Sequence, residues 1–158
     1  MKGKRMSALV VPSIAALKQH VNAEVGITDY LEVSQERITA FAELTEDRQW
    51  IHTDVERARR ESPFGGTVAH GFLTLAFLSR FLAAAVTVEG TKLIVNCGLN
   101  TVRFLDPVPA AGRIRARVRL RECAEDQDFV QATWRLTIEC EGSRFPSCIA
   151  DWIVRYYA

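Results

Sequence analysis

The sequence has almost no net charge and no apolar run long enough to cross a membrane. Its 158 residues contain 20 Lys and Arg and 19 Asp and Glu, which gives a formal net charge of +1. Because the two signs are interspersed along the chain, no basic surface for nucleic acid is expected. The longest apolar stretch, residues 71–86, is short for a bilayer span and carries Arg80 near its centre. We therefore expect one soluble domain with no nucleic-acid or membrane partner.

The sequence also has no paired cysteine motif, and no signal peptide is expected from its opening residues. The four cysteines have no C-x-x-C spacing, and three of them lie in strand-like patterns, where cysteine behaves as a small apolar residue. The basic opening, residues 1–5, is followed by only about five apolar residues before Pro12, too few for a signal core. We expect a cytoplasmic protein without disulfides or a zinc site, with residues 1–12 as a loose N-terminal segment.

Proline and internal glycine are absent from residues 71–86, and the rest of the chain is organised around this stretch. It is rich in Leu and Ala, and its apolar residues fall on every face of a helical wheel, interrupted only by Ser79 and Arg80 after Thr74. A helix that is apolar all round is buried all round. The stretch therefore predicts a long central helix wrapped by a sheet.

Shorter helices are expected before the central helix, each beginning after a residue that can cap it. These helices are predicted over 14–21, 35–43 and 54–61, with Ser13, Ser34 and either Thr53 or Asp54 as their caps. Residues 30–33 are typical of a strand entry, and residues 63–66 form a turn that leads to the central helix.

The chain after Gly90 is typical of strands. Residues 113–121 alternate strictly, with apolar side chains on one face and five arginines on the other. These arginines have the geometry to meet the phosphates of coenzyme A, but a solvated outer face is favoured. Strands are predicted over 92–104, 113–121, 129–140 and 148–157.

Helices followed by antiparallel strands with short turns predict an α+β domain. One long buried helix against one curled antiparallel sheet is the hot-dog arrangement, and the whole chain is expected to form a single hot-dog domain. Such a sheet leaves strand edges and an apolar flank exposed unless another subunit covers them. We therefore expect a homodimer or a higher homo-oligomer.

An acid and an imidazole, Asp47 and His52, lie five residues apart in a predicted loop. Their neighbours Trp50 and Ile51 are apolar and would exclude water if both polar side chains turn toward one cavity. Low dielectric would then bring the two pKa values toward a range useful for acid–base chemistry. The spacing alone favours the non-catalytic interpretation, an Asp that caps a helix and a His in the core or on the surface.

Two stretches resemble a known family. Residues 41–54 read FAELTEDRQWIHTD and residues 63–73 read PFGGTVAHGFL, and together they resemble the hydratase motif of MaoC-like dehydratases, the R-specific enoyl-CoA hydratases of hot-dog fold. The motif QWIH at residues 49–52, with NCGLNTVRF at residues 96–104, is most similar to the nodulation-protein-N-like branch of this family. The resemblance covers roughly residues 33–109, about half of the chain.

The resemblance implies reversible addition of water to a trans-2-enoyl thioester, carried by coenzyme A or an acyl carrier, without a cofactor. Asp47 and His52 match the catalytic dyad: His52 is the better general base for water, and Asp47 passes a proton to or from the α-carbon, although the pair can titrate as a unit. Gly71 matches the glycine whose backbone N–H binds the thioester carbonyl, at a helix start that suits an enolate-like oxygen. Further substrate contacts are expected from Gln49, Trp50, Phe64, Gly65 and His70.

Glu46 departs from the family pattern, which usually has glycine before the catalytic Asp. Either the backbone there has a positive φ and Glu46 is strained, or its carboxylate raises the pKa of Asp47. This residue favours one alternative, a non-catalytic acyl-thioester-binding subunit. The other alternative is a hot-dog thioesterase, against which the Asp47/His52 pairing argues.

Three further features have more than one interpretation. For His70, a structural role that holds the loop by a hydrogen bond is favoured over a substrate contact. Asn96 and Asn100 either satisfy buried backbone groups or line the substrate tunnel. A metal at Asp47, His52 and His70 is disfavoured because no tight ligand spacing is present.

Overall fold

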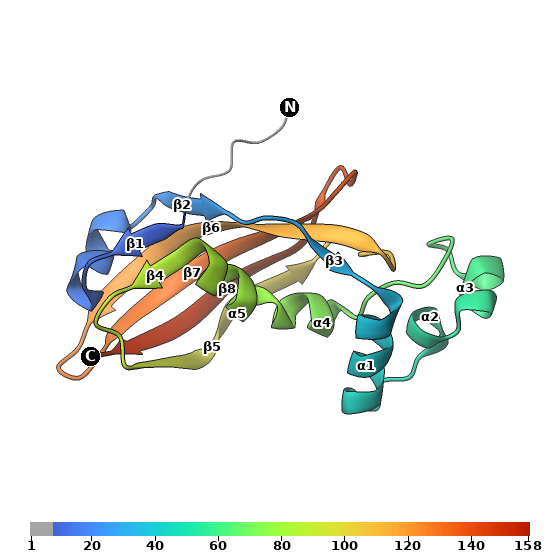
Figure 1. Cartoon of the computed structure of the whole chain (residues 1–158), viewed down its shortest axis with the longest axis horizontal. Coiled ribbons are helices and arrows are strands. Elements are labelled where there is room, and N and C mark those ends of the chain that lie inside the picture. The colour runs from blue at the N-terminus through green and yellow to red at the C-terminus, as the bar shows by residue number, and fades with distance from the viewer. Residues whose placement is uncertain (1–7) are drawn as a thin grey trace.

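A curled antiparallel sheet forms the centre of the computed structural model, which describes residues 8–158 (Figure 1). Its strands are β2 (Glu24–Ile27), β3 (Leu31–Val33), β5 (Leu93–Phe104), β6 (Gly112–Glu125), β7 (Val130–Cys140) and β8 (Pro146–Tyr157). They lie in the order β2-β6-β7-β8-β5, with β3 also paired to β6, and every pairing is antiparallel. The four long strands predicted after Gly90 are confirmed, and so is the α+β fold.

The helices lie across the sheet and beyond one of its ends (Figure 1). They are the 3₁₀ helix η1 (Ile14–His20) and the α-helices α1 (Gln35–Thr45), α2 (Trp50–Thr53), α3 (Val55–Glu61), α4 (Gly71–Ala76) and α5 (Leu78–Ala85). Ser13, Ser34 and Asp54 cap η1, α1 and α3, each accepting a hydrogen bond from the backbone N–H three residues later. These caps confirm the three predicted helix starts.

The central helix is broken in two, which the sequence did not predict. Phe77 separates α4 from α5 at φ −71° and ψ −7°. One side of α5 is exposed, with Ser79, Arg80, Ala83 and Ala84 on it, and the Phe72 ring of α4 is 69% exposed. The prediction of a single helix buried on every side is therefore wrong for one chain, because the sheet covers only one side of it.

The core lies between the sheet and α5. Alternate residues of β6, β7 and β8 are buried, among them Trp134, whose indole N–H donates to the hydroxyl of Tyr156 at 3.0 Å. This bond satisfies polar groups that burial would otherwise leave unpaired. Gly26 brings β2 close to α5, since a Cβ at this position would lie 3.1 Å from the Cβ of Ala85.

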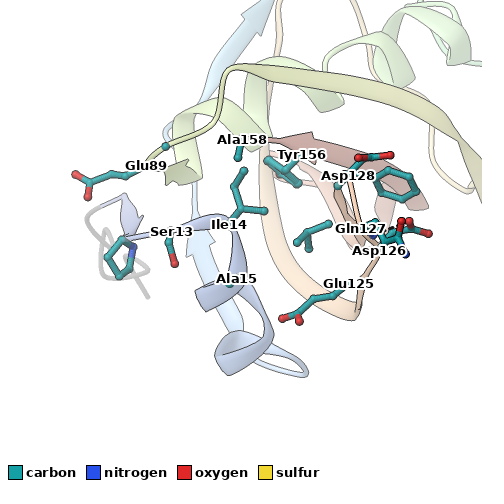
Figure 2. A pocket seen from close by; sticks show the side chains of 14 residues that line it. Ser13, Ile14, Ala15, Glu89, Glu125, Asp126, Gln127, Asp128, Tyr156 and Ala158 are labelled. Atoms are coloured by element: carbon teal, nitrogen blue, oxygen red, sulfur yellow. Dashed lines mark hydrogen bonds between the residues drawn. The ribbon is translucent and has the colours of Figure 1, made fainter.

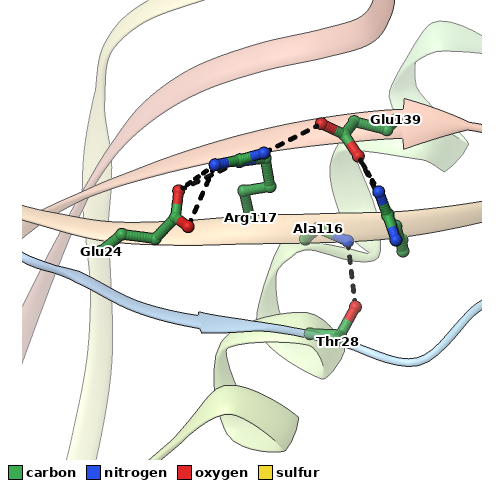
Figure 3. A network of polar contacts seen from close by, with 6 residues as sticks. Glu24, Thr28, Ala116, Arg117 and Glu139 are labelled. Atoms are coloured by element: carbon green, nitrogen blue, oxygen red, sulfur yellow. Dashed lines mark hydrogen bonds and ion pairs between the residues drawn. The ribbon is translucent and has the colours of Figure 1, made fainter. Parts of the chain in front are cut away.

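The opposite face of the sheet carries the arginines of β6, and acidic side chains pair with them (Figure 3). Arg117 lies 2.8 Å from Glu24 and 3.9 Å from Glu139, and Arg115 lies 2.8 Å from the same Glu139. Partly exposed pairs of this kind contribute about 1 kcal/mol or less each. This geometry agrees with the favoured interpretation, a solvated outer face.

The N-terminal part of the described chain is ordered, contrary to expectation. Strand β1 (Leu9–Val11) pairs in parallel with β4 (Val86–Val88), and Val11 is fully buried. The prediction of a loose segment over residues 1–12 is therefore wrong for β1, because its apolar side chains find a partner strand directly after α5; residues 1–7 lie outside the described chain. Within residues 8–158, no helix is long and apolar enough to cross a membrane.

Candidate active site

The loop that carries Asp47 begins with an unusual backbone conformation. Glu46 ends α1 with φ 61° and ψ 11°, in the left-handed region. Residues other than Gly, Asn and Asp rarely adopt this backbone conformation, because their Cβ approaches the following carbonyl oxygen. The first of the two possibilities for Glu46 is the right one, and it explains physically why glycine suits this position.

His52 lies on a short helix and not in a loop as predicted. The four residues of α2 turn the His52 side chain inward, where the residue is 7% exposed, whereas Asp47 remains exposed. The hydroxyl of Thr53 donates to the carbonyls of Arg48 and Gln49, both at 3.3 Å, and so closes this turn.

A backbone hydrogen bond fixes the tautomer of His52. Its Nδ1 lies 2.6 Å from the carbonyl oxygen of Val68. A carbonyl oxygen only accepts, so Nδ1 carries the hydrogen and Nε2 of the neutral ring keeps a free lone pair. A ring held in this way can act as a general base through Nε2.

Two residues that sequence reasoning missed hold the helix of His52 in place. The Gln35 amide donates to the carbonyl of His52 at 2.8 Å and accepts a hydrogen bond from the hydroxyl of Thr67. Gln35 thereby links α1, α2 and the segment before α4. Nothing in the sequence marks it, because a Gln at the start of a helix usually faces solvent.

His70 contacts both members of the predicted pair. Its Nε2 lies 2.9 Å from the carbonyl oxygen of Asp47, and its ring stacks on His52 with centroids 3.8 Å apart and planes at 26°. The residue is 2% exposed, and its Nδ1 is buried without a hydrogen-bond partner among the described residues. The hydrogen bond is of the kind expected for a structural role.

The surroundings of His52 favour its neutral form. Burial lowers the pKa of His52 below its ordinary value of 6.5, and this effect outweighs the hydrogen bond to Val68, which raises it. Smaller contributions come from His70, which lowers the pKa, and from Asp47, which raises it. A buried neutral imidazole beside a carboxylate is suited to take up a proton during a reaction.

The same three side chains are the candidate metal ligands. One nitrogen from each imidazole and one carboxylate oxygen of Asp47 lie within 4.8 Å of one another. A metal ion lies in the plane of an imidazole that binds it, and two rings stacked 3.8 Å apart cannot both meet this condition without turning. The absence of a metal site stays a prediction, which this geometry favours.

Gly71 and Phe64 line a cavity of about 300 Å³ beside α4. Gly71 is the first residue of α4, where N–H groups lack partners within the helix, and it packs on the ring of Phe104. Thr74 and Ser147 are buried residues of the cavity wall. Asp47 and His52 do not belong to this wall, which includes Ala69 and Gly71 on either side of His70.

Three further predicted contacts, Gln49, Trp50 and Gly65, do not belong to the wall of this cavity. Gln49 is exposed and precedes α2, and its side chain makes no cap hydrogen bond. The Trp50 ring lies under the guanidinium of Arg57, 4.4 Å from ring centroid to Cζ. Gly65 is exposed in the turn before α4 and has φ 75°, which suits glycine.

A second cavity, of about 230 Å³, lies between α4 and the sheet and is lined by Phe72, Leu99 and Trp152, among others. Asn96 lines it and accepts a hydrogen bond from the Trp152 indole at 2.7 Å, so it satisfies a side-chain donor while facing a cavity. Asn100 is exposed. The largest of these cavities, about 430 Å³, contains none of the predicted site residues and has an acidic rim that includes Glu89 and Glu125 (Figure 2).

Comparison with known proteins gives the same family as the sequence motifs. A profile of the MaoC-like domain matches residues 15–139. The chain is 47% identical over 147 residues to 3-hydroxyacyl-thioester dehydratase Z of Mycobacterium tuberculosis, covering 92% of this chain and 97% of that protein. Nodulation protein N of Rhizobium leguminosarum is 38% identical over 143 residues, with 89% of each chain covered.

The fold also matches solved structures. The monoamine oxidase regulatory protein from Archaeoglobus superposes with a TM-score of 0.74 at 22% identity, over 96% of this chain and 98% of that one. These matches confirm the resemblance and the hot-dog fold. The chain belongs to the MaoC-like dehydratase family of hydro-lyases, in the branch that includes nodulation protein N.

Proposed function

We propose that this protein is an R-specific enoyl-thioester hydratase that also dehydrates R-3-hydroxyacyl thioesters. The observation that carries the proposal is the buried His52, whose hydrogen is fixed on Nδ1 by Val68 so that Nε2 keeps a lone pair, and whose ring has a nitrogen within 4.8 Å of an Asp47 carboxylate oxygen. The relative from Mycobacterium tuberculosis, named a 3-hydroxyacyl-thioester dehydratase, supports it at 47% identity. The R configuration rests on the motif resemblance.

In this proposal the two side chains catalyse the addition of a hydroxyl group to the β-carbon and of a proton to the α-carbon, both from one molecule of water. His52 Nε2 takes a proton from water as its oxygen bonds to the β-carbon, which leaves an enolate. The Asp47 carboxylate then takes this proton from His52 and delivers it to the α-carbon, so that the pair ends as it began and all atoms and charges balance. The backbone N–H of Gly71, at the start of α4, donates a hydrogen bond to the thioester oxygen, on which the enolate charge develops. The reaction is acid–base chemistry and requires no cofactor.

The first experiment is hydration of crotonyl-CoA, followed by the loss of enoyl-thioester absorbance. Asp47→Asn and His52→Asn should each lower kcat by at least about 10²-fold, the usual scale for a positioned acid or base. Asn at position 52 suits the test because its amide nitrogen can take the place of Nδ1 and keep the bond to Val68. The product should be the R enantiomer of 3-hydroxybutyryl-CoA.

Other readouts of the same assay separate the alternatives. Release of free thiol without loss of the double bond would indicate a thioesterase. Binding of short, long and branched enoyl thioesters without turnover would indicate an acyl-thioester-binding subunit. Either result contradicts the hydratase proposal.

We also propose that two copies of the chain assemble through one apolar strip. Five large apolar side chains that are each at least 40% exposed form this strip: Phe64, Phe72, Leu99, Phe104 and Leu105. The five side chains are continuous. The rings of Phe72 and Phe104 contact each other. Leu99 lines the same cavity as Phe72, and Phe64 and Leu105 line the same cavity as Phe104. An apolar strip of this kind on one chain needs cover.

The edge of the sheet next to the strip supports a second copy as that cover. Strand β5 pairs only with β8 among the described strands, and Arg103 is its single charged residue. Natural edge strands usually carry more charges or a proline to prevent pairing. Register shifts at Cys97 and Asn100 bend this edge, so the apolar strip is the main part of the proposed interface.

A further inference from the structure

His70 is placed to act on both members of the proposed pair without belonging to it. It donates a hydrogen bond from Nε2 to the main chain of Asp47, and its ring lies 3.8 Å from that of His52. We propose that His70 is a positioning residue that holds the main chain of Asp47 and the ring of His52 in the arrangement the reaction needs. This inference rests on the proposed hydratase function.

The hydrogen bonds fix complementary tautomers in the two stacked rings. A carbonyl oxygen accepts in each bond, so the neutral rings carry their hydrogens on Nδ1 of His52 and on Nε2 of His70. A hydrogen on Nδ1 of His70 would meet no acceptor among the described residues. The alternative tautomer would therefore lose one hydrogen bond and bury an unpaired donor, which burial penalises.

The loop of Asp47 needs the support of His70 because the backbone at the start of this loop is strained. Glu46 enters the loop in the left-handed region, and the Asp47 side chain is exposed. His70 comes from the segment before α4 and so connects this loop to the helix start that presents Gly71. One contact thereby relates the acid–base pair to the expected position of the thioester.

The groups that face the two rings are few. His70 is flanked by Phe41 from α1, with centroids 5.1 Å apart, and by His52 from α2. The groups that act on His52 are the Val68 carbonyl, Asp47 and His70 itself. Removing the His70 imidazole therefore removes one of the two influences that lower the pKa of His52.

Two variants separate the hydrogen bond from the ring. His70→Gln can place an amide nitrogen near the former Nε2 and keep the bond to Asp47, whereas His70→Phe keeps a flat ring beside His52 and loses the bond. We expect His70→Phe to lower kcat about tenfold, because Asp47 and His52 shift relative to each other. KM should change little, because the cavity wall at Gly71 stays in place. His70→Gln should retain kcat within about threefold.

The pH profile supplies a readout that simple packing would not change. In both variants the acid limb of kcat/KM should move to higher pH, because the unfavourable interaction of His70 with protonated His52 is gone. Imidazole NMR gives the same quantity without any substrate, and it is simple in a chain with three histidines. The signals of His20, on η1 at the other end of the molecule, should be identical in every variant (Figure 1).

The outcomes decide the proposal in every case. Equal loss of activity in both variants, with a raised KM and an unchanged titration of His52, would show that His70 only fills space or touches substrate. If neither variant folds, the wild-type tautomers decide: hydrogens on Nδ1 of His52 and Nε2 of His70 support the proposal, and any other pair overturns it. A wild-type protein that hydrates no enoyl thioester would overturn the proposed function, and the NMR measurements would then still test the positioning role.

Discussion

The left-handed backbone at Glu46 is a cost that this chain carries directly beside its proposed catalytic acid. A residue with a Cβ loses roughly 1–2 kcal/mol in this region relative to glycine, part of which is offset because glycine gives the unfolded chain more freedom. Family members with glycine at this position avoid the strain. Here the strain is compatible with the fold because α1, α2 and His70 hold the loop from several sides.

We expect Glu46→Gly to stabilise the protein by about 0.5–1 kcal/mol, since φ 61° becomes unstrained. Such a change corresponds to a rise of about 1–4 °C in the melting temperature of a chain of this size. Glu46→Ala is the matched control, because it removes the same carboxylate and keeps a Cβ. An equal gain from Ala and Gly would assign the effect to the charge and contradict the backbone explanation.

The buried His52 should also make stability depend on pH. Its pKa in the folded chain lies below 6.5, its ordinary value, so below about pH 6.5 the unfolded chain binds a proton that the folded chain does not. The contribution of His52 is therefore complete above pH 6.5 and is lost as the pH falls through the folded pKa. Urea unfolding of wild type and His52→Asn between pH 7.5 and 5 tests this, because the shared carboxylates cancel in the difference. Parallel curves for the two proteins would show that His52 titrates normally.

The sequence predicted individual residues better than their environment. The motif singled out Asp47, His52 and Gly71, whose roles stay predictions, and the expected hydrogen bond of His70 is present. It did not indicate Gln35, Thr67 or the stacked rings. These contacts depend on how α1, α2 and the segment before α4 meet in space, which no spacing within one element encodes.

At the scale of helices and strands, the sequence predicted those features that depend on residues close together in the chain. The caps at Ser13, Ser34 and Asp54 and the alternation of the long strands were readable, because each depends on residues close in sequence. The break at Phe77 and the pairing of β1 with β4 were not. No Pro or Gly marks the break, and the parallel pairing joins segments about 77 residues apart.

The contact between the start of α4 and the end of β5 offers a test of element packing. A Cβ on Gly71 would lie 3.2 Å from two ring atoms of Phe104, so Gly71→Ala should push the two elements apart by a few tenths of an ångström. We expect kcat/KM to fall about tenfold, because a small misplacement of reacting groups is costly. The melting temperature should change little, since alanine favours the helix while the contact opposes it.

Two further variants check this explanation by the same assay. Gly66→Ala is the matched control, because nothing lies within 4 Å of a Cβ at this position, and its activity should equal that of wild type. Phe104→Leu should restore activity to Gly71→Ala by making room for the methyl group. If the double variant is as slow as Gly71→Ala alone, the contact with Phe104 is not the cause.

At the scale of the whole molecule, a single chain leaves two surfaces exposed. The central helices are exposed on the side away from the sheet, and the apolar strip runs from the turn before α4 to β5 and the loop after it. The predicted all-round burial of residues 71–86 fails in the monomer for this reason.

The resulting prediction concerns the mass of the particle in solution. Wild type should sediment at twice the 17.7 kDa of one chain at micromolar concentration. Leu99→Lys should weaken dimerisation by at least about 10²-fold, because it places a charge within the buried part of an apolar interface. Val10→Lys is the matched control: Val10 is 56% exposed on β1, outside the strip, and its substitution should leave the dimer intact. A wild-type monomer, or a dimer that Leu99→Lys does not weaken, would contradict this interface.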